Sequence, residues 1–388
     1  TSSLKSALFC LEKIRRMFWG IIEEMSSLVD GKKPAKSHKK ASTKVAVIIP
    51  NWNGAVEITK CLGSLQKQSL KPHIIVVDNG SEDDSVQIIE EKFAAVELIK
   101  NPTNLGFAGG VNTGFKKALK DDFKYVATLN NDAFADKDWL KHLVSTLDHN
   151  HKTGIATCKL MTADGKKIDS TGDCYTVWGL PYPRGRGEKD EGQYDDMTEI
   201  FAASGGASIY RAEMLDKIGL FDTDFFAYYE DVDLSFRAQL AGWQVRYVPE
   251  AKGYHQISAT SSKIKGFSTY QTMKNLQLLL YKNVPKKYLG KVGRRFFLAE
   301  TLFFLRALTR GQGISAFKGD AKGTFLLFKV FKERKPIHKN KKVTDEYIWS
   351  MFDHDLPPNA AALRRLRSRW WRLRGKKATH AENPAKLN

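Results

Sequence analysis

Several short apolar runs of this 388-residue chain end in, or are followed by, a residue with a carboxylate or amide side chain. The runs over 45–50, 73–78, 96–100 and 125–130 predict buried strands, and the polar residues at or just after their ends are Asn51, Asp78, Asn101 and Asn130. A carboxylate in such a place can accept hydrogen bonds, so Asp78 could read the N–H of a uracil or thymine base. The alternative is that Asp78 and the following Asn79 only form a turn.

A glycine-rich stretch, NPTNLGFAGGVNTGF, occupies residues 101–115 and leads into an expected helix over 110–120. Gly106 and Gly109 would let the backbone approach a ligand closely, and the N-terminus of a helix favours a diphosphate. Asn104 and Asn112 lie in the same stretch. The spacing is neither the dinucleotide-binding fingerprint nor a P-loop, and a loop without a ligand is the competing interpretation.

Two residues are candidates for holding a divalent cation. Asp132 follows the fourth expected strand in LNNDAF, and its carboxylate could bind Mg²⁺ or Mn²⁺ whose other ligands are diphosphate oxygens and water. His255 comes just after another expected strand, and imidazole is a common metal ligand. A helix cap for Asp132 and a purely structural role for His255 are the alternatives.

A cluster of carboxylates opens the stretch FAYYEDVDLSFRAQLAGW, residues 226–243. Like charges repel, so at least one of Glu230 and Asp231 is expected to have a raised pKa and to suit the role of general base. For Asp233 the simpler interpretation is favourable interaction with the N-terminus of the helix.

The elements that must position these residues alternate between strand and helix. Helical segments are expected over 56–68, 84–93 and 110–120, between the four apolar runs. Alternating units of this kind indicate an open, mostly parallel α/β sheet, whose ligands bind beyond the carboxyl ends of the strands. Beyond Ser261 the pattern becomes helical, with apolar residues near 276–284, 296–308 and 314–331.

The net charge of +19 comes from 62 Lys and Arg against 43 Asp and Glu, and most of the excess lies at the two ends. Residues 1–44 combine an expected amphipathic helix over 4–29 with a lysine-rich linker, and the tail contains ALRRLRSRWWRLRGKK at 362–377. Basic ends on a nearly neutral body fit an anionic bilayer surface or a nucleic acid. Four scattered cysteines suggest a reducing compartment, and no uncharged apolar stretch is long enough to span a bilayer.

Six sequence motifs and one histidine, taken in their order along the chain, resemble those of one protein family. They are PNWNG (50–54), VVDNGS (76–81), NLGFAGGVNTG (104–114), LNNDA (129–133), SGGASIYRAEMLDKIGLFDTDFF (204–226), YYEDVDLSFR (228–237) and His255. Together they resemble the inverting family 2 glycosyltransferases of GT-A fold, and within them the bacterial rhamnosyltransferase-like branch. The resemblance spans about residues 44–285. It implies a Rossmann-like sheet flanked by helices, with an N-terminal amphipathic helix and a C-terminal helical extension.

The resemblance also implies a role for each matching residue. Asp132 and His255 would hold the metal, Mn²⁺ or Mg²⁺, and Asp231 would be the catalytic base, with Glu230 beside it as the second candidate. One departure stands out, because the usual Asp-x-Asp is Asn130-Asn131-Asp132 here, which weakens the expected hold on the metal. The residues assigned to the nucleotide sugar are Pro50, Asn51, Asn53, Asp78, Asn79, Asn104, Gly106, Gly109, Asn112, Asn130 and Asn131.

The function implied is transfer of a sugar, L-rhamnose from dTDP-rhamnose, onto a lipid-linked or cell-wall glycan acceptor, with inversion at the anomeric carbon. We expect a transferase domain over 45–265, preceded by the helix and linker of 1–44 and followed by a helical, basic, membrane-associating region over 266–388. The expected location is the cytoplasmic side of the plasma membrane, peripherally attached, and oligomerisation stays open.

Other interpretations remain at this stage. The same fold could use a UDP-hexose or a galactofuranose donor, or could retain nucleotide-sugar binding without activity. A basic nucleic-acid-binding protein is the alternative from another class, because mixed aromatic and arginine residues can stack on bases. Against it, Asp78, Asp132, Glu230 and Asp231 would line the main cleft with negative charge.

Overall fold

The computed structural model describes residues 44–256 and 264–358, together with 360 and 364. These residues belong to one compact unit that begins at Thr43. The amphipathic segment over 4–29 and the arginine-rich segment over 362–377 were both singled out from the sequence. Apart from Arg364, they lie outside the described residues. The domain boundary expected after 265 stays a prediction.

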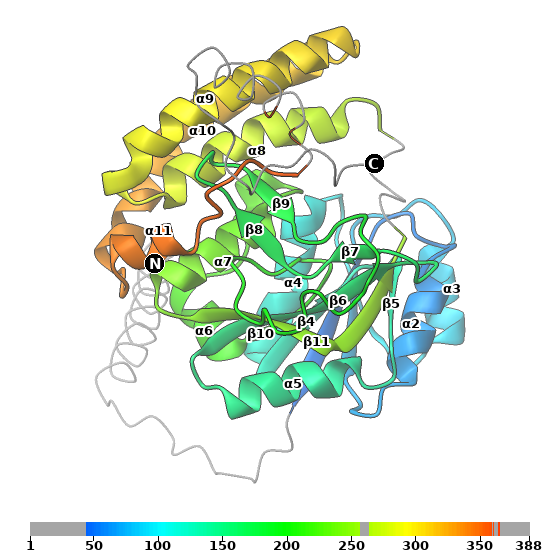
Figure 1. Ribbon diagram of the computed structural model, residues 1–388. Coiled ribbons are helices and arrows are strands. Elements are labelled where there is room, and N and C mark those ends of the chain that lie inside the picture. The colour runs from blue at the N-terminus through cyan, green and yellow to red at the C-terminus, as the bar shows by residue number, and fades with distance from the viewer. Residues whose placement is uncertain (1–43, 257–263, 359, 361–363, 365–388) are drawn as a thin grey trace, which may run out of the picture. The chain divides into compact units, whose positions relative to one another are not determined.

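A nine-stranded sheet forms the centre of the described unit (Figure 1), with the strand order β3-β2-β1-β4-β10-β6-β11-β5 and β7 paired to β6. The first four strands in chain order run parallel, as the alternating pattern predicts. Beyond β4 the sheet is mixed, because β10 runs antiparallel to both β4 and β6. The strands are β1 (Val45–Asn51), β2 (His73–Asp78), β3 (Glu97–Lys100), β4 (Tyr125–Leu129), β5 (Ala133–Ala135), β6 (Thr153–Thr162), β7 (Ile168–Ser170), β10 (Ala207–Arg211) and β11 (Gln244–His255).

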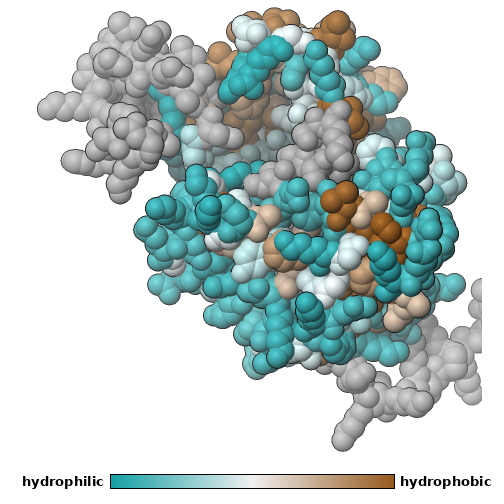
Figure 2. Space-filling view, turned by 90° about the vertical axis from the view of Figure 1, so that its right-hand side faces the viewer, coloured by the Kyte–Doolittle hydropathy of each residue, from teal (hydrophilic) through white to brown (hydrophobic). Residues whose placement is uncertain are grey.

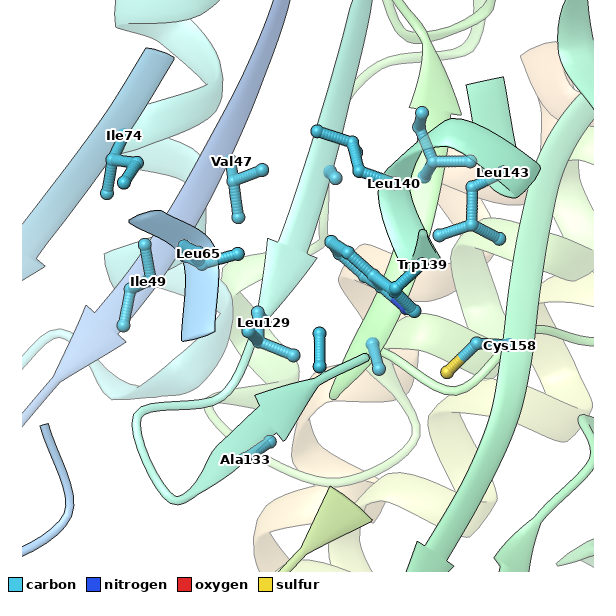
Figure 3. Packing of buried hydrophobic residues seen from close by; sticks show 14 of the residues in the cluster. Val47, Ile49, Leu65, Ile74, Leu129, Ala133, Trp139, Leu140, Leu143 and Cys158 are labelled. Atoms are coloured by element: carbon cyan, nitrogen blue, oxygen red, sulfur yellow. The ribbon is translucent and has the colours of Figure 1, made fainter. Parts of the chain in front are cut away.

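Helices cover both faces of the sheet, so the central strands are buried on both sides. On β1, Val47 and Ile49 face the core beneath α2 and α5, whereas Ala46 and Ile48 face α4 and α7. Figure 3 shows the first of these cores, in which Trp139 lies among aliphatic side chains from several strands. The helices of this part are α2 (Ile58–Gln66), α3 (Ser85–Lys92), α4 (Gly106–Lys120), α5 (Trp139–His149), α6 (Ala212–Ile218) and α7 (Glu230–Leu240).

The C-terminal part is helical, as expected, and packs on α7. A third core joins residues of α7 and α8 to the short hairpin of β8 (Asp173–Tyr175) and β9 (Pro181–Pro183). Helix α10 approaches α8 very closely, since a Cβ at Gly319 would come within 2.3 Å of the Tyr270 carbonyl oxygen. The remaining elements are η1 (Thr223–Phe225), α8 (Phe267–Asn283), α9 (Lys286–Thr309), α10 (Gly313–Lys339) and α11 (Asp345–Ser350). No helix within the described residues is both long enough and apolar enough to cross a bilayer.

Candidate active site

The carboxyl ends of β1 and β2 place Asn51 and Asp78 side by side in the parallel register. The Asn51 Nδ2 group donates to Asp78 Oδ1 at 3.1 Å and to Ser85 Oγ at 2.9 Å. Asp78 also accepts from the backbone N–H and the hydroxyl of Ser81. Both residues are buried. A base N–H reaching Asp78 would therefore share a carboxylate that the protein already holds in a fixed orientation.

The loops that follow β1 and β4 interlock at the same edge. Asn131 Nδ2 donates to Asn51 Oδ1 at 2.9 Å, and a Cβ at Gly54 would fall 2.1 Å from that Asn131 nitrogen. Asn53 has a φ of 50°, and its backbone N–H donates to Ser81 Oγ at 2.9 Å. Pro50 precedes this loop as a partly buried residue of β1. The residues predicted from PNWNG and LNNDA thus belong to one contact network.

The glycine-rich stretch forms the start of α4, which begins at Gly106, four residues earlier than expected. Gly106 has a φ of +74°, and a Cβ there would lie 2.5 Å from the Phe226 carbonyl oxygen, so only glycine fits. Asn104 Oδ1 accepts the Gly106 N–H at 2.8 Å, and Asn79 Nδ2 donates to the Gly106 carbonyl at 2.9 Å. Gly109 is buried one turn later. The loop is fixed against β2 before any ligand is present.

Asn112 has a different environment from the other residues predicted to contact the nucleotide. It is buried on α4, donates to the Phe221 carbonyl at 2.8 Å and accepts the Phe221 N–H at 3.1 Å. Both ends of its amide hold the segment before η1. The structure therefore accounts for Asn112 through packing, and its contact with a nucleotide stays a prediction.

Asp132 and His255 lie together, although 123 positions separate them in the sequence. His255 Nε2 is 3.1 Å from Asp132 Oδ1, and its Nδ1 is 2.8 Å from Oδ2 of the buried Asp169. Burial of the ring opposes protonation, but hydrogen bonds and charges from the two carboxylates prevail and raise the pKa of His255 to about 9. Antiparallel pairing of β5 with the end of β11 creates this arrangement, because it sets His255 opposite Ala133.

The donor set at this point fits a divalent cation. Asp132 supplies a hard carboxylate oxygen and His255 an imidazole nitrogen whose orientation Asp169 fixes from behind. The Asn130 side-chain oxygen is buried and meets no hydrogen-bond partner within the described part of the chain. Asn130 Nδ2 lies 3.4 Å from His255 Nε2, so the unsatisfied acceptor is beside the two candidate ligands. A cation there would give this oxygen a partner.

The candidate base Asp231 is in the first turn of α7 and is hydrogen-bonded to the segment just before β10. Its Oδ2 accepts the Gly205 N–H at 2.7 Å, and its Oδ1 accepts the Val232 N–H at 2.8 Å. Burial raises the pKa of Asp231, although these two backbone donors act in the opposite direction. The neighbouring Gly206 carbonyl accepts the Asn130 N–H at 2.9 Å. Two adjacent glycines therefore connect the candidate base to the loop that carries the candidate metal ligand.

Glu230 and Asp233 differ sharply from each other, although both are buried. Burial and the charge of Asp231 raise the pKa of Glu230 well above its usual range, and Glu230 Oε2 meets no hydrogen-bond partner in the described residues. Asp233 pairs with Arg237 at 2.8 Å and with Lys282 at 3.5 Å. Burial opposes its ionisation, but these cations hold the pKa of Asp233 below its usual value. The interpretation of Asp233 as structural is consistent with this pairing.

Two carboxylates of the site were missed from the sequence. Asp169 on β7 orients His255, and Asp173 on β8 lies near Asp231, where burial and the charge of Asp231 raise the pKa of Asp173 to about 7. Both belong to the short segment KIDSTGDCY, which has neither a clear period nor a known motif. Only the pairing of β7 with β6 and of β8 with β9 reveals their position.

Helix α8 holds the backbone just before the candidate base, which the sequence also did not reveal. Phe226, Tyr228 and Tyr229 all have positive φ, between 62° and 71°, a conformation that costs free energy for such side chains. Asn275 Nδ2 donates to the carbonyls of Phe225, Ala227 and Tyr228 at 2.8 to 2.9 Å. This buried amide therefore stabilises the strained turn that sets where α7 begins.

An acidic group elsewhere is already neutralised. Asp222, Asp224 and Glu333 bring carboxylate oxygens within 4.8 Å of one another. Lys282 contacts Asp222 and Glu333, and Lys329 contacts Asp224 and Glu333. Lysines therefore occupy the position that a cation would take.

Comparison with known proteins agrees with the geometry at the carboxyl edge of the sheet. Residues 46–219 match the family model described as glycosyl transferase family 2. The chain carries a glycosyltransferase family 2 domain. The match covers β1 to α6, which includes the candidate nucleotide loops and Asp132, and ends before Asp231 and His255.

Two curated relatives extend the comparison of this family 2 domain. An N-acetylglucosaminyl-diphospho-decaprenol L-rhamnosyltransferase of Mycobacterium tuberculosis (strain ATCC 25618 / H37Rv) is 25% identical over 239 residues, which cover 56% of this chain and 77% of that protein. A poly-beta-1,6-N-acetyl-D-glucosamine synthase of Staphylococcus aureus (strain COL) is 24% identical over 195 residues, which cover 49% of this chain and 44% of that protein.

The fold of the family 2 domain also resembles a solved structure. GalNAc-T7 in complex with UDP, GalNAc and Mn²⁺ superimposes with a TM-score of 0.50 at 14% identity, over 64% of this chain and 49% of that one. Together with the sheet topology, this likeness identifies the fold as GT-A, a Rossmann-like sheet flanked by helices.

Proposed function

We propose that this glycosyltransferase is a metal-dependent, inverting enzyme that transfers L-rhamnose from dTDP-rhamnose to a lipid-linked or cell-wall glycan. The observation that carries the proposal is the connection between the candidate base and the candidate cation site. Gly205 donates to Asp231 at 2.7 Å, and the adjacent Gly206 accepts from Asn130 at 2.9 Å. An inverting displacement needs a base and a leaving-group site in a fixed relation, which these two bonds supply.

The donor would bind along the carboxyl edge of the parallel strands. Asp78, held by Asn51, would accept a hydrogen bond from the base, and the pre-formed turn at Gly106 would let the backbone approach the diphosphate. Asp132 and His255 would hold Mn²⁺ or Mg²⁺. When bound, the cation would supply charge neutralisation for the departing nucleoside diphosphate.

The chemical step would be a single in-line displacement. Asp231 would take the proton from the acceptor hydroxyl, whose oxygen forms a bond to the anomeric carbon. The bond from that carbon to the diphosphate oxygen breaks at the same time, and its electron pair leaves with the diphosphate. In this scheme the Asp231 carboxylate, which the Gly205 and Val232 N–H groups hold in place, would face the acceptor. The configuration at the anomeric carbon would invert.

The identity of donor and acceptor draws on the relatives. A protein named as an L-rhamnosyltransferase acting on N-acetylglucosaminyl-diphospho-decaprenol supports rhamnose as the sugar and a polyprenyl-linked acceptor. The lipid of such an acceptor would lie in a bilayer, and the location that we propose for the enzyme is the inner face of the plasma membrane. The name of the second relative refers to a polymer of N-acetyl-D-glucosamine, which favours a UDP-linked hexose as the second candidate donor.

A donor panel tests this proposal. Full-length protein is incubated with dTDP- and UDP-linked sugars, and release of the nucleoside diphosphate is measured with Mn²⁺, with Mg²⁺ and with excess chelator. We expect dTDP-rhamnose to be turned over fastest, and turnover to stop in chelator. Preference for a UDP-hexose would show that this sugar nucleotide, and not dTDP-rhamnose, is the donor. Full activity in chelator would overturn the assignment of Asp132 and His255 as metal ligands.

A further inference from the structure

Helices α9 and α10 expose an unusual number of large apolar side chains. Phe297 is 71% exposed, Phe317 63%, Phe325 67% and Phe328 78%. Figure 2 shows apolar side chains at the top of the molecule, where Figure 1 places these two helices. We call this set the hairpin face, and its residues are Phe297, Leu298, Leu305, Leu308, Ile314, Phe317, Phe325, Phe328 and Phe331. Large apolar side chains that are exposed together on neighbouring helices indicate an interaction site.

The exposure follows from helical spacing and not from loose packing. On α10 the exposed Ile314, Phe317, Phe325 and Phe328 recur at steps that keep them on one side of a helix. The opposite side of α10 is buried through four small or branched residues, which are Ala316, Gly319, Gly323 and Val330. The helix therefore has two apolar sides, and only one of them has a partner in the described part of the protein.

The exposed sides of α9 and α10 meet at the turn between the helices. A surface hollow of about 570 Å³ is lined by Phe304 and Leu308 from α9 and by Ile314, Phe317 and Lys318 from α10. Gly311 and Gly313 complete its wall. The two stripes thus form one continuous surface at this end of the hairpin.

Positive charge surrounds the hairpin face. Residues 286–339 contain 14 Lys and Arg but only 3 Asp and Glu. Lys318, Lys322, Lys332 and Lys335 are exposed on α10 beside the phenylalanines. The three acidic residues, Glu300, Asp320 and Glu333, are only partly exposed, and Asp320 pairs with Gln277 on α8. The charge presented to a partner is therefore strongly positive.

We propose that the α9–α10 hairpin binds the surface of an anionic bilayer. The hairpin face would lie at the boundary between acyl chains and headgroups, and the lysines would meet anionic headgroups. Interfacial helices combine Lys and Arg with Phe and Leu in this manner, whereas the cores of protein interfaces are depleted in lysine. A second copy of the chain is the poorer partner, because a two-fold contact would set the same cationic surface against itself.

The place of the hairpin in the fold suggests why such binding matters, and this step rests on the proposed function. Helix α8 is packed against α10 through Gly319 and Gly323 on one side. On another side its Asn275 holds the carbonyls of 225–228, just before Asp231. One helix thus connects the bilayer-binding surface to the candidate base, so an acceptor whose lipid lies in the bilayer would present its sugar near Asp231.

Vesicle sedimentation of the full-length protein tests the inference. The probe is vesicles of equal parts phosphatidylglycerol and phosphatidylcholine, with pure phosphatidylcholine as the uncharged comparison. The test variant combines Phe317→Ser, Phe325→Ser and Phe328→Ser, whose side chains are exposed and so do not support the core. Met197→Ser is the matched control, since Met197 is 56% exposed on a loop far along the chain from the hairpin. A third variant combines Lys318→Gln, Lys322→Gln and Lys332→Gln.

We expect the phenylalanine variant to bind the anionic vesicles about tenfold more weakly or worse, and Met197→Ser to bind like wild type. The lysine variant should lose affinity at low salt but less at high salt. Equal sedimentation of wild type and the phenylalanine variant would overturn the inference. A wild-type dimer that this variant converts to monomer, with no change in vesicle binding, would also overturn it and place a second copy on the hairpin face.

Release of nucleoside diphosphate in solution separates this inference from the proposed function. If the phenylalanine variant keeps this activity and its circular dichroism while losing vesicle binding, the hairpin acts as a binding surface. A different outcome is that neither the wild type nor any variant turns over a sugar nucleotide while vesicle binding still depends on the phenylalanines. In that case the proposed function fails and the bilayer-binding surface stands.

Discussion

Asp231 and Gly205 are joined by a 2.7 Å hydrogen bond from the Gly205 N–H to the Asp231 carboxylate, across 26 positions of sequence. This bond, with a second one from the Val232 N–H, fixes the carboxylate at the first turn of α7. A Cβ at Gly205 would come within 3.2 Å of Asp231 Oδ2, so the glycine also keeps space for the carboxylate. This hydrogen bond brings the SGGAS and YYEDVD motifs together in the fold.

Asp231→Asn should lower turnover by the 10²–10⁴-fold typical of a positioned general base while donor affinity changes little. The amide keeps the shape of the side chain but cannot take the acceptor proton. Steady-state kinetics and calorimetric titration with the donor measure the two effects. Glu230→Gln is the companion variant, because Glu230 is the adjacent buried carboxyl. Near-normal turnover of Asp231→Asn with a large loss in Glu230→Gln would transfer the role to Glu230.

Asp169→Asn should weaken Mn²⁺ binding by about 10–100-fold, the usual effect of removing the partner that orients a histidine ligand. Asp169 Oδ2 lies 2.8 Å from His255 Nδ1, whereas Asp132 approaches the other ring nitrogen, Nε2. Electron paramagnetic resonance of free Mn²⁺ measures the affinity without any substrate. Asp132→Ala and His255→Ala should weaken binding further. Unchanged Mn²⁺ affinity in all three variants would move the cation site elsewhere.

Asn275→Ala should lower the free energy of unfolding by about 1–3 kcal/mol and should also reduce turnover, because three carbonyls before α7 lose their donor. Urea denaturation and kinetics measure the two effects. Gln277→Ala is the matched control on α8, since its amide bonds Asp320 and not the strained turn. Equal effects of both variants on turnover would show that Asn275 acts only through general stability.

The raised pKa of Asp173 should make the free energy of unfolding depend on pH. Burial and the charge of Asp231 raise the pKa of Asp173 to about 7, so the folded protein keeps a proton that the unfolded chain releases above about 4. The free energy of unfolding therefore falls as pH rises from about 4 to about 7. We expect about 1–2 kcal/mol from this residue, below the roughly 4 kcal/mol of the full shift because the side chain is only partly buried.

Urea denaturation at pH 5 and pH 8 measures this contribution. Asp173→Asn carries a neutral side chain at both pH values and should remove that part of the fall. Asp216→Asn, on the surface of α6, serves as the exposed control and should leave the fall in place. An unchanged pH dependence in Asp173→Asn would show that Asp173 is ionised in the folded protein.

The sequence predicts the parallel half of the fold well, because its signal is local. The apolar runs ending at Asn51 and Asp78 became β1 and β2, which pair in parallel as expected, and the helix predicted over 110–120 is part of α4. The mixed half of the sheet could not be derived in this way. The insertion of β10 between β4 and β6 depends on pairings between residues 51 to 86 positions apart.

The candidate site shows the same division. Asp132 and His255 were predicted as metal ligands, and the structure brings them within 3.1 Å, but their role stays a prediction. Asp169 and Asp173 could not be found, because short irregular strands carry no period to read. The positive charge was located only in part, since residues 45–330 as a whole are nearly neutral. Within this range the negative net charge of residues 45–285 offsets part of the positive net charge of residues 286–330, where the α9–α10 hairpin begins.

Nuclear magnetic resonance of the reaction product shows whether this protein transfers a sugar with inversion. Full-length protein is supplied with Mn²⁺, the preferred sugar nucleotide from the donor panel and a short acceptor glycan, and the anomeric configuration of the new linkage is compared with that of the donor. We expect consumption of the sugar nucleotide and the opposite configuration in the product, with consumption 10²–10⁴-fold slower in Asp231→Asn. Retained configuration, or no consumption of any sugar nucleotide, would contradict it.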